Sequence, residues 1–428
     1  MKEIKKVAVL GANGTMGSLS GGLFAQAGIT CIYFARSQEK AQGGIENAVK
    51  QARSEVLRKY IVPKTYESLE EEIPQCDWIL EAVAENLPLK REYFHAVDRF
   101  RKKESVVSTI SSSLSIEDMA EECSDDFKSH FMGVHFFNPP GKLFANELVF
   151  HPKNSAALKS FVSDFCERVL MRVNIVTYNR PGFAGNRIGF QLLNEAARFA
   201  EKYGVEEIDY FIGPYTGRTL APLATIDLVG LDVHKEIVNN IYQNVQDERH
   251  DSFQLPDYVK KMLDKKMLGN KSREAGGFYR YSEKKEKYTL DPLNLEFKPV
   301  KNTKHEVIEN IKTHIHDGNY QEAVDLIKHG QSDELSLVKH FILGYISYSY
   351  SRIGEVTPVE EGIHGIDRVM SYGFSWLPPS AWVDYFGGPR ETIKLLDKSN
   401  MHVPRQLKDI HDEKVCRIPE VTKYLVAR

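Results

Sequence analysis

Three glycines stand at regular spacing directly after the first apolar stretch of the chain. Val7–Leu10 has the composition of a buried strand, and Gly11, Gly14 and Gly17 follow it in a G-x-x-G-x-x-G pattern. The next residues, to about Ala27, have the pattern of a helix. Glycine is needed where a strand-to-helix turn bends tightly and approaches a phosphate, whose charge the helix N-terminus then stabilises. This context predicts a dinucleotide-binding site. Its expected contacts are Gly11, Gly14, Thr15, Met16 and Gly17.

Short β-branched stretches alternate with helix-like stretches over the first 180 residues. Strands are expected at 7–10, 30–34, 78–83, 105–110 and 132–137. This alternation predicts a parallel sheet with helices on both faces. After Arg180 the spacing becomes helical, with Pro181 placed to begin a helix that runs to Tyr203. No further strand is expected beyond that point.

The second half of the chain repeats part of its own sequence. Ile208-Asp209, Pro222, Ala224 and Asp227 recur as Ile366-Asp367, Pro379, Ala381 and Asp384, at an offset of 157 or 158 residues. Several matches at one offset predict a duplicated helical domain, with a Lys-, Glu- and Pro-rich linker near 283–306. We therefore predict a Rossmann-type α/β domain over 1–180 and two all-α domains related by duplication, over 181–300 and 301–428. The last of these is expected to be architectural.

Composition and charge exclude several classes of protein. The chain has 56 Lys+Arg against 59 Asp+Glu and a net charge of -3, so no overall positive charge favours nucleic-acid binding. No apolar stretch approaches the length that spans a bilayer. The five scattered cysteines include no C-x-x-C pair and indicate neither a disulfide framework nor a zinc site. We expect a cytoplasmic protein without a metal, a nucleic-acid partner or a membrane span.

The residues after the second expected strand bear on the choice between NAD and NADP. An NAD enzyme usually has Asp or Glu there, which accepts a hydrogen bond from the ribose 2′-hydroxyl. Here the sequence is Ala35-Arg36-Ser37. A small neutral residue followed by Arg36 and Ser37 leaves space and donors for a 2′-phosphate, which favours NADP. The alternative is that Arg36 is a solvated loop charge.

A histidine ends another expected strand, just before an Asn-Pro turn. His135 stands where open α/β sheets bind ligands, although a lone histidine is more often structural. Glu147 lies twelve residues further on, past a Pro-Pro-Gly turn that would bring the two segments together. Its carboxylate would then hold one ring nitrogen and raise the basicity of the other, as in a general base.

These motifs together resemble the L-3-hydroxyacyl-CoA dehydrogenase family of fatty acid β-oxidation. The residues that carry the resemblance are the glycine loop, Glu81–Leu87, Ser112–Leu114, His135–Pro139, Pro181–Phe183 with Asn186–Arg187, Asp227–Asp232 and Gly277–Tyr279. They follow the family's order from residue 5 to about residue 281. The later segment resembles the second helical copy of longer members, although it lacks an equivalent of Asn186–Arg187.

The resemblance implies interconversion of L-3-hydroxyacyl-CoA and 3-oxoacyl-CoA, with hydride passing to or from NAD or NADP. His135 would be the general base and Glu147 would orient it. Ser112 would hydrogen-bond the substrate hydroxyl. Asn186 would steady the reacting oxygen or the histidine.

The resemblance also implies contacts with the cofactor and with CoA. Glu85 would reach the nicotinamide ribose, and Asn138 the nicotinamide amide or the substrate carbonyl. Lys50 and Arg53, on the helix after the second strand, are candidates for contacts with the CoA phosphates. Single-copy members dimerise through the helical domain, so a second copy within one chain favours a monomer or a homodimer.

Two other functions are compatible with the same residues. A dehydrogenase of a small 3-hydroxy acid without CoA would keep His135 and Glu147 and lose the pantetheine-binding helix. A non-catalytic binding protein would keep only the fold. The joint presence of the His, Glu, Ser and Asn residues disfavours this last alternative.

Overall fold

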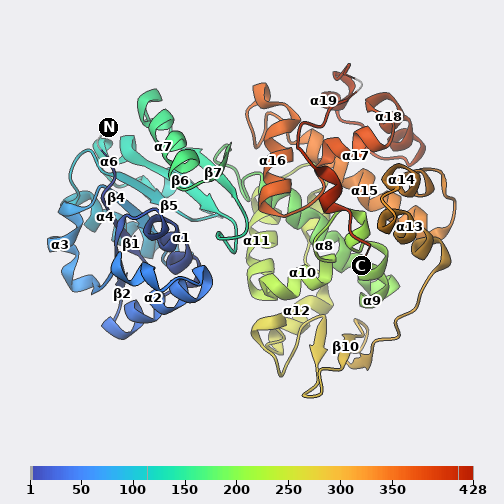
Figure 1. Cartoon of the computed structure of the whole chain (residues 1–428), viewed down its shortest axis with the longest axis horizontal. Coiled ribbons are helices and arrows are strands. Elements are labelled where there is room, and N and C mark those ends of the chain that lie inside the picture. The colour runs from blue at the N-terminus through green and yellow to red at the C-terminus, as the bar shows by residue number, and fades with distance from the viewer. Residues whose placement is uncertain (1–2, 113, 413, 428) are drawn as a thin grey trace. The chain divides into compact units, whose positions relative to one another are not determined.

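The computed structural model describes residues 3–112, 114–412 and 414–427 of a chain that divides into two compact units (Figure 1). The first unit holds residues 1–183 and Val356–Pro358, and the second holds residues 184–355 and 359–428. Both helical segments therefore belong to one compact unit. The boundary proposed for them at residue 300 stays a prediction.

Within its described residues, the first unit is built on an eight-stranded sheet of order β3-β2-β1-β4-β5-β6-β7-β8 (Figure 1). The strands are β1 (Lys6–Leu10), β2 (Thr30–Ala35), β3 (Ile61–Thr65), β4 (Trp78–Glu81), β5 (Val106–Thr109), β6 (Phe131–Phe136), β7 (Ala145–Phe150) and β8 (Val173–Val176). Neighbouring strands are parallel except for β6 and β7. The strand order reverses at β1, which is where open α/β sheets bind ligands.

The five strands expected from the sequence are confirmed, but β3, β7 and β8 were missed and the sheet is not wholly parallel. β3 and β8 are edge strands with partly exposed residues, and Pro63 lies within β3, as an edge position allows. β7 carries buried Asn146 and Glu147, which interrupt its apolar pattern. Short strands of this kind give a weak sequence signal.

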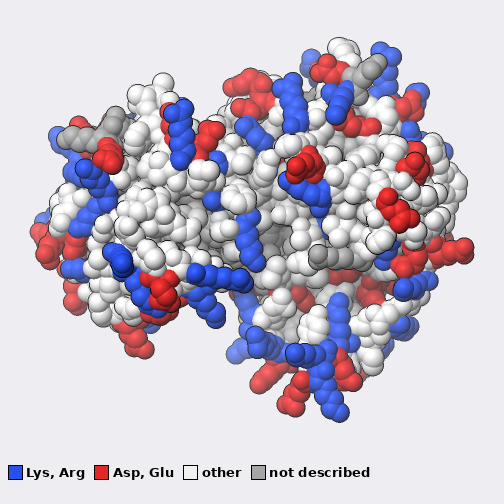
Figure 2. Space-filling view, in the orientation of Figure 1, with Lys and Arg blue, Asp and Glu red and all other residues white. Residues whose placement is uncertain are grey.

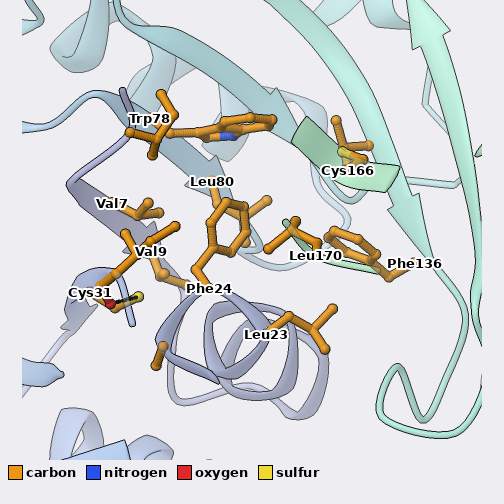
Figure 3. Close-up of a cluster of buried hydrophobic side chains, with 14 of the residues drawn as sticks. Val7, Val9, Leu23, Phe24, Cys31, Trp78, Leu80, Phe136, Cys166 and Leu170 are labelled. Atoms are coloured by element: carbon orange, nitrogen blue, oxygen red, sulfur yellow. Dashed lines mark hydrogen bonds between the residues drawn. The ribbon is translucent and has the colours of Figure 1, made fainter. Parts of the chain in front are cut away.

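Helices cover both faces of this sheet. They are α1 (Thr15–Gln26), α2 (Gln38–Ala52), α3 (Leu69–Glu72), α4 (Leu87–Phe100), α5 (Ile116–Ala120), α6 (Asp125–His130) and α7 (Ala156–Arg168). Alternate residues of β1 enter two separate cores, with Val7 and Val9 in one and Ala8 and Leu10 in the other. In the first core, Phe24 of α1 packs beside Val7, Val9 and Trp78 (Figure 3). Burial on both faces fixes the sheet and the ends of its strands.

The second unit is mainly helical. Its helices are α8 (Gly185–Tyr203), α9 (Val205–Phe211), α10 (Pro222–Val229), α11 (Leu231–Asn244), α12 (Asp257–Asp264), α13 (Glu306–His316), α14 (Tyr320–His329), α15 (Asp333–Ser351), α16 (Ile363–Gly373), α17 (Pro379–Tyr385), α18 (Pro389–Lys398) and α19 (Arg405–Lys408). The expected helix start at Pro181 was wrong. Gly182 and Phe183 have φ values of +77° and +47°, which a right-handed helix does not allow, so α8 begins at Gly185.

The expectation of no strand after residue 180 was also wrong. β9 (Tyr279–Tyr281), β10 (Lys287–Leu290) and β11 (Phe297–Pro299) form an antiparallel sheet, and β10 and β11 lie in the stretch expected to be a linker. These short strands are rich in lysine and tyrosine and largely exposed, so their alternation is weak. Over the described residues, no helix has both the length and the apolar character needed to cross a membrane. Figure 2 shows acidic and basic side chains interspersed on the face in view.

The two halves of the second unit contain similar aspartate contacts at equivalent positions. Asp209 accepts bonds from the N–H groups of Leu223 and Ala224, at 2.7 and 3.0 Å, in the first turn of α10. Asp367 accepts bonds from the N–H and the hydroxyl of Ser380, at 3.2 and 2.6 Å, in the first turn of α17. Each aspartate therefore satisfies donors at a helix start that has no side-chain cap of its own.

A second pair of aspartates is matched in the same way. Asp227 accepts bonds from both N–H groups of Phe278–Tyr279, at 2.8 Å each. Asp384 accepts bonds from both N–H groups of Val415–Cys416, at 2.7 and 3.0 Å. In each copy a helix carboxylate thus accepts hydrogen bonds from the backbone of a later segment, and these matched contacts support the duplication.

The two copies also meet at equivalent residues. Arg218 and Trp376 form an antiparallel bridge and differ by the 158-residue offset of the repeat. The N–H of Leu377 donates to the carbonyl of Gly217 at 2.7 Å beside this bridge. A residue that pairs with its own counterpart lies at a two-fold axis, as in an isologous dimer interface. The second unit therefore contains a local two-fold arrangement within one chain.

We predict that Asp227→Ala lowers the free energy of unfolding by about 2 to 4 kcal/mol, since two buried N–H groups lose their acceptor. Asp264→Ala, which removes an exposed carboxylate from α12, should change it by less than about 0.5 kcal/mol. Urea unfolding of both variants measures the difference. Equal effects would contradict the role assigned to Asp227.

Candidate active site

A histidine and a glutamate face each other across β6 and β7. The antiparallel register pairs His135 with Glu147, and the His135 Nδ1 lies 2.7 Å from the Glu147 Oε2. The Glu147 side chain is 0 % exposed and that of His135 is 10 % exposed. With the Nδ1 proton donated to Glu147, the Nε2 lone pair is the one that can accept a proton. The proximity expected from the sequence is therefore present, through strand pairing.

Aromatic rings restrict the plane of this imidazole. Phe137 and Phe183 meet the His135 ring edge-on, with centroids at 5.0 and 5.8 Å. Phe183 is buried in the core that also contains Leu10 at the end of β1. The ring of His135 is thus held on one side by its carboxylate and on others by packing. Such a residue keeps one orientation, as proton transfer requires.

The glycine loop lies between the end of β1 and the start of α1. Gly11 has φ of +78°, and a Cβ atom there would come within 2.4 Å of the Ala82 carbonyl oxygen. A Cβ atom at Gly17 would come within 2.4 Å of the Gly11 carbonyl oxygen. Only glycine fits at either position, so the loop is tight and held against the residue that follows β4.

The same loop presents the positive end of α1. Gly14 is the N-cap residue, and the first turn, which includes Thr15 and Met16, holds no acidic side chain. Thr15 is exposed and Met16 is half-buried. Unpaired N–H groups and a favourable dipole at a glycine turn suit the pyrophosphate of a dinucleotide. The donor set present therefore fits the expected cofactor.

Beside this loop, residues 82–86 are held by a buried ion pair. The Lys90 Nζ lies 2.8 and 2.9 Å from the two carboxylate oxygens of Glu81, and both side chains are almost fully buried. The Thr109 hydroxyl and the Val83 N–H also donate to Glu81, at 2.5 and 2.7 Å. Burial raises the pKa of Glu81, and these donors oppose that shift. The four contacts fix the loop at the carboxyl edge of the sheet.

Glu85, a predicted cofactor contact, belongs to this loop. Its carboxylate accepts a hydrogen bond from the Ser111 hydroxyl and lies 3.3 Å from the Lys90 Nζ. The sequence predicts Glu85 as a cofactor contact, which stays a prediction, and does not predict Lys90, Glu81 and Ser111 as its neighbours. A strand that ends in glutamate, followed by a lysine in the next helix, was the available signal.

Ser112 and Asn138 also lie in loops of the first unit. Ser112 is half-buried in the loop after β5, and its neighbour Ser113 lies outside the described residues. Asn138 is exposed after β6 and is joined to Pro139 by a cis peptide bond. β5 and β6 run parallel to β1, so these loops share one edge of the sheet with the glycine loop. Asn186, in the second unit, is the buried second residue of α8.

The residues predicted to select NADP follow β2. Ala35 is buried and offers no side-chain acceptor, while Arg36 is exposed. The Ser37 hydroxyl caps α2 by accepting from the Lys40 N–H at 3.3 Å. Ser37 therefore has a structural role, and its hydroxyl proton is left available for another acceptor.

The two predicted CoA contacts lie at the other end of α2. Lys50 and Arg53 are exposed, and Arg53 ends the helix in the left-handed conformation with φ of +51°. Gln51, between them, lines a groove with Gln26 at the end of α1. The last turn of α2 therefore lies beside the C-terminal end of α1, whereas the glycine loop lies at the N-terminal end of α1. The CoA role of these two residues stays a prediction.

Models of known families match most of the chain. The 3-hydroxyacyl-CoA dehydrogenase NAD binding domain matches residues 6–180, and the 3-hydroxyacyl-CoA dehydrogenase C-terminal domain matches residues 182–281. The chain belongs to the 3-hydroxyacyl-CoA dehydrogenase family. The resemblance expected from the sequence is confirmed. The family places an NAD-binding domain where the glycine loop lies.

Individual relatives agree with this family assignment. A protein of Bacillus subtilis named "Probable 3-hydroxyacyl-CoA dehydrogenase" is 31% identical over 443 aligned positions, covering 96% of this chain and 54% of that protein. One of the same name from Deinococcus radiodurans is 32% identical, covering 65% of this chain and 83% of that protein. The chain thus spans about half the length of the Bacillus relative.

A solved structure shares the fold over both units. The 3-hydroxybutyryl-CoA dehydrogenase of Escherichia coli has a TM-score of 0.67 and 18% identity, covering 92% of this chain and 94% of that chain. At this identity the likeness shows the fold alone. Its coverage extends the dehydrogenase fold to residues beyond the second family model.

We predict that Lys90→Met destabilises the protein by about 3 to 5 kcal/mol, because Glu81 is left as an unpaired buried charge. The variant should also bind the dinucleotide more weakly, because residues 82–86 lose their anchor. Lys103→Met, at an exposed position, is the control. Thermal unfolding and cofactor titration by nicotinamide fluorescence measure both effects. Binding equal to that of the control would contradict this role.

Proposed function

We propose that this chain interconverts L-3-hydroxyacyl-CoA and 3-oxoacyl-CoA, with hydride passing to or from NAD or NADP. The observation that carries the proposal is the buried His135–Glu147 pair at the carboxyl end of β6. The strands that carry this pair belong to the same sheet as β1, and β1 leads into a glycine loop suited to a dinucleotide. Membership of the 3-hydroxyacyl-CoA dehydrogenase family supports the reaction class.

In this reaction the histidine handles the proton. When the hydroxyacyl substrate is oxidised, the Nε2 of His135 accepts the proton of the 3-hydroxyl as hydride leaves the same carbon. The imidazolium that forms stays bonded to the buried carboxylate of Glu147 at 2.7 Å, a charge-assisted contact. The nicotinamide cofactor supplies or accepts the hydride when bound. In the reducing direction the same imidazolium returns the proton to the carbonyl oxygen.

The supporting roles are part of the same proposal. Ser112 and Asn186 donate hydrogen bonds near the reacting oxygen, and Glu85 and Asn138 contact the nicotinamide end of the cofactor. Glu85 is suited to this because Ser111 and the residues around it hold its carboxylate in place. CoA is the expected carrier of the acyl group. A monomer or homodimer and a cytoplasmic location also stay predictions.

We predict that His135→Gln lowers kcat by about a hundredfold to ten-thousandfold, because glutamine cannot accept the proton. Glu147→Gln should lower it less, since the imidazole remains but its cationic form loses a charged partner. The rate is followed by the absorbance of the reduced nicotinamide with acetoacetyl-CoA as substrate. His95→Gln, at an exposed site on α4, should stay within about twofold of the unmodified protein.

The substrate of the same assay separates the alternatives. Reduction of acetoacetyl-CoA without reduction of free acetoacetate supports the proposal. Reduction of free acetoacetate at a similar rate selects a dehydrogenase of CoA-free hydroxy acids. With either substrate, His135→Gln should lose the activity. If it keeps the activity, His135 is not the base. Activity with neither substrate favours a binding protein.

We further propose a preference for NADP over NAD. Ala35 offers no carboxylate to the ribose 2′-hydroxyl, and the exposed Arg36 is free to turn toward a 2′-phosphate. The Ser37 hydroxyl proton is a second donor.

We predict higher kcat/KM with NADPH than with NADH, and a reversal of this order in Ala35→Asp. The new carboxylate would accept a bond from the 2′-hydroxyl and repel a 2′-phosphate, changing the ratio by about tenfold or more. Arg36→Ala should lower kcat/KM for NADPH alone. Better turnover of the unmodified protein with NADH would refute the preference.

A further inference from the structure

A fully buried arginine stands in the first turn of α8. Arg187 is the third residue of that helix and is 0 % exposed. Its Nε donates to the Tyr348 hydroxyl at 2.6 Å, and its Nη2 donates to Asp247 and Glu355 at 2.7 and 2.9 Å. A buried guanidinium is costly unless it is paired and hydrogen-bonded, and these partners satisfy that requirement.

Three residues of the 301–428 segment complete this arginine cluster, which we define as Arg187, Asp247, Tyr348, Arg352 and Glu355. The Tyr348 hydroxyl donates to the Asp247 Oδ2 at 2.9 Å. The Arg352 Nη1 donates to the same oxygen at 2.6 Å and lies 2.7 Å from a Glu355 carboxylate oxygen. Burial raises the pKa of Asp247, but the Arg187 hydrogen bond and the two arginine charges lower it overall. Asp247 is therefore a carboxylate shared between the two copies.

The first turn of α8 carries this ion-paired arginine. Its N-cap residue, Ala184, has no side-chain acceptor, and the first turn contains no acidic residue. Gly182 and Phe183 bend the chain just before it through left-handed conformations. Arg187, through its ion pairs with Asp247 and Glu355, thus links the first turn of α8 to its neighbours. Asn186 precedes Arg187 in the same turn, so whatever fixes the arginine also fixes the asparagine.

We propose that Tyr348, Arg352 and Glu355 are positioning residues that act on Asn186 through Arg187. The segment from 301 to 428 then serves the reaction as well as the architecture of the second unit. This inference rests on the proposed function, in which Asn186 hydrogen-bonds near the reacting oxygen. Tyr348 is central because its hydroxyl accepts from Arg187 and donates to Asp247.

The test begins with Tyr348→Phe, which removes this hydroxyl and leaves the ring. The matched control is Tyr345→Phe, one helical turn earlier on α15, whose buried hydroxyl donates to the Leu377 carbonyl at 3.3 Å. We expect kcat for acetoacetyl-CoA reduction to fall about tenfold in Tyr348→Phe and less than twofold in the control. KM for the nicotinamide cofactor should be unchanged in both. Equal kcat in the two variants overturns the proposal.

A double-mutant cycle separates positioning from general loosening of the fold. In an Asn186→Ala background, Tyr348→Phe should lower kcat by less than twofold, since the residue it acts on is gone. A further tenfold loss in that background overturns the proposal. Glu355→Gln is the second variant if Tyr348→Phe does not fold, because its side chain is 37 % exposed and keeps its size. The same non-additivity is expected for it.

Failure of the proposed function is distinguishable from failure of this inference. If the unmodified protein does not reduce acetoacetyl-CoA, the proposed function and the positioning role are both overturned. If it does so and Tyr348→Phe retains full kcat, only the positioning role is overturned, and Glu355→Gln serves in its place if Tyr348→Phe does not fold. Thermal unfolding of Tyr348→Phe and Tyr345→Phe provides the stability comparison. Similar midpoints with unequal kcat support positioning.

Discussion

The antiparallel pairing of β6 and β7 is the constraint on which the candidate site depends. His135 and Glu147 are opposite each other in that register, and cross-strand neighbours of this kind have Cβ atoms about 5 Å apart. A slip of one residue would turn Glu147 to the other face of the sheet. The buried residues of β7 and its parallel pairing with β8 oppose such a slip. The geometry of the His135–Glu147 pair is therefore set by the pairing of β6 and β7.

Some of this was readable from the sequence, because the evidence for it is local. The glycine spacing, the strand before it and the helix after it lie within about twenty residues of each other, and each supports the other. His135 and Glu147 are also close in sequence. The antiparallel direction of β7 was not read, because Asn146 and Glu147 break the apolar pattern that identifies a strand. The start of α8 was misplaced because Pro181 suits a helix start, while the conformation of Phe183 depends on its burial in the core.

The supports of the site could not be predicted in the same way. Lys90 and Thr109 both donate to Glu81 from different elements, and a single sequence does not show that these three residues converge. The duplication was readable because matched letters recur at one offset. The structure adds that Asp209 and Asp367 make equivalent contacts, each in its own copy, and that Asp227 and Asp384 do the same. In each copy these carboxylates accept hydrogen bonds from backbone N–H groups, so the repeated aspartates meet the same need for an acceptor in both copies.

The local two-fold arrangement makes the arginine cluster the informative exception. Contacts between the copies can join equivalent positions, as the bridge between Arg218 and Trp376 does. The cluster does not repeat, because the second copy lacks an equivalent of Asn186–Arg187 and supplies the partners of that arginine instead. A buried ionic network is by itself weak evidence for stability, and we infer that this one fixes a single geometry at the start of α8. The asymmetry is thus best explained by a division of labour, in which one copy carries the site asparagine and the other holds its helix in register.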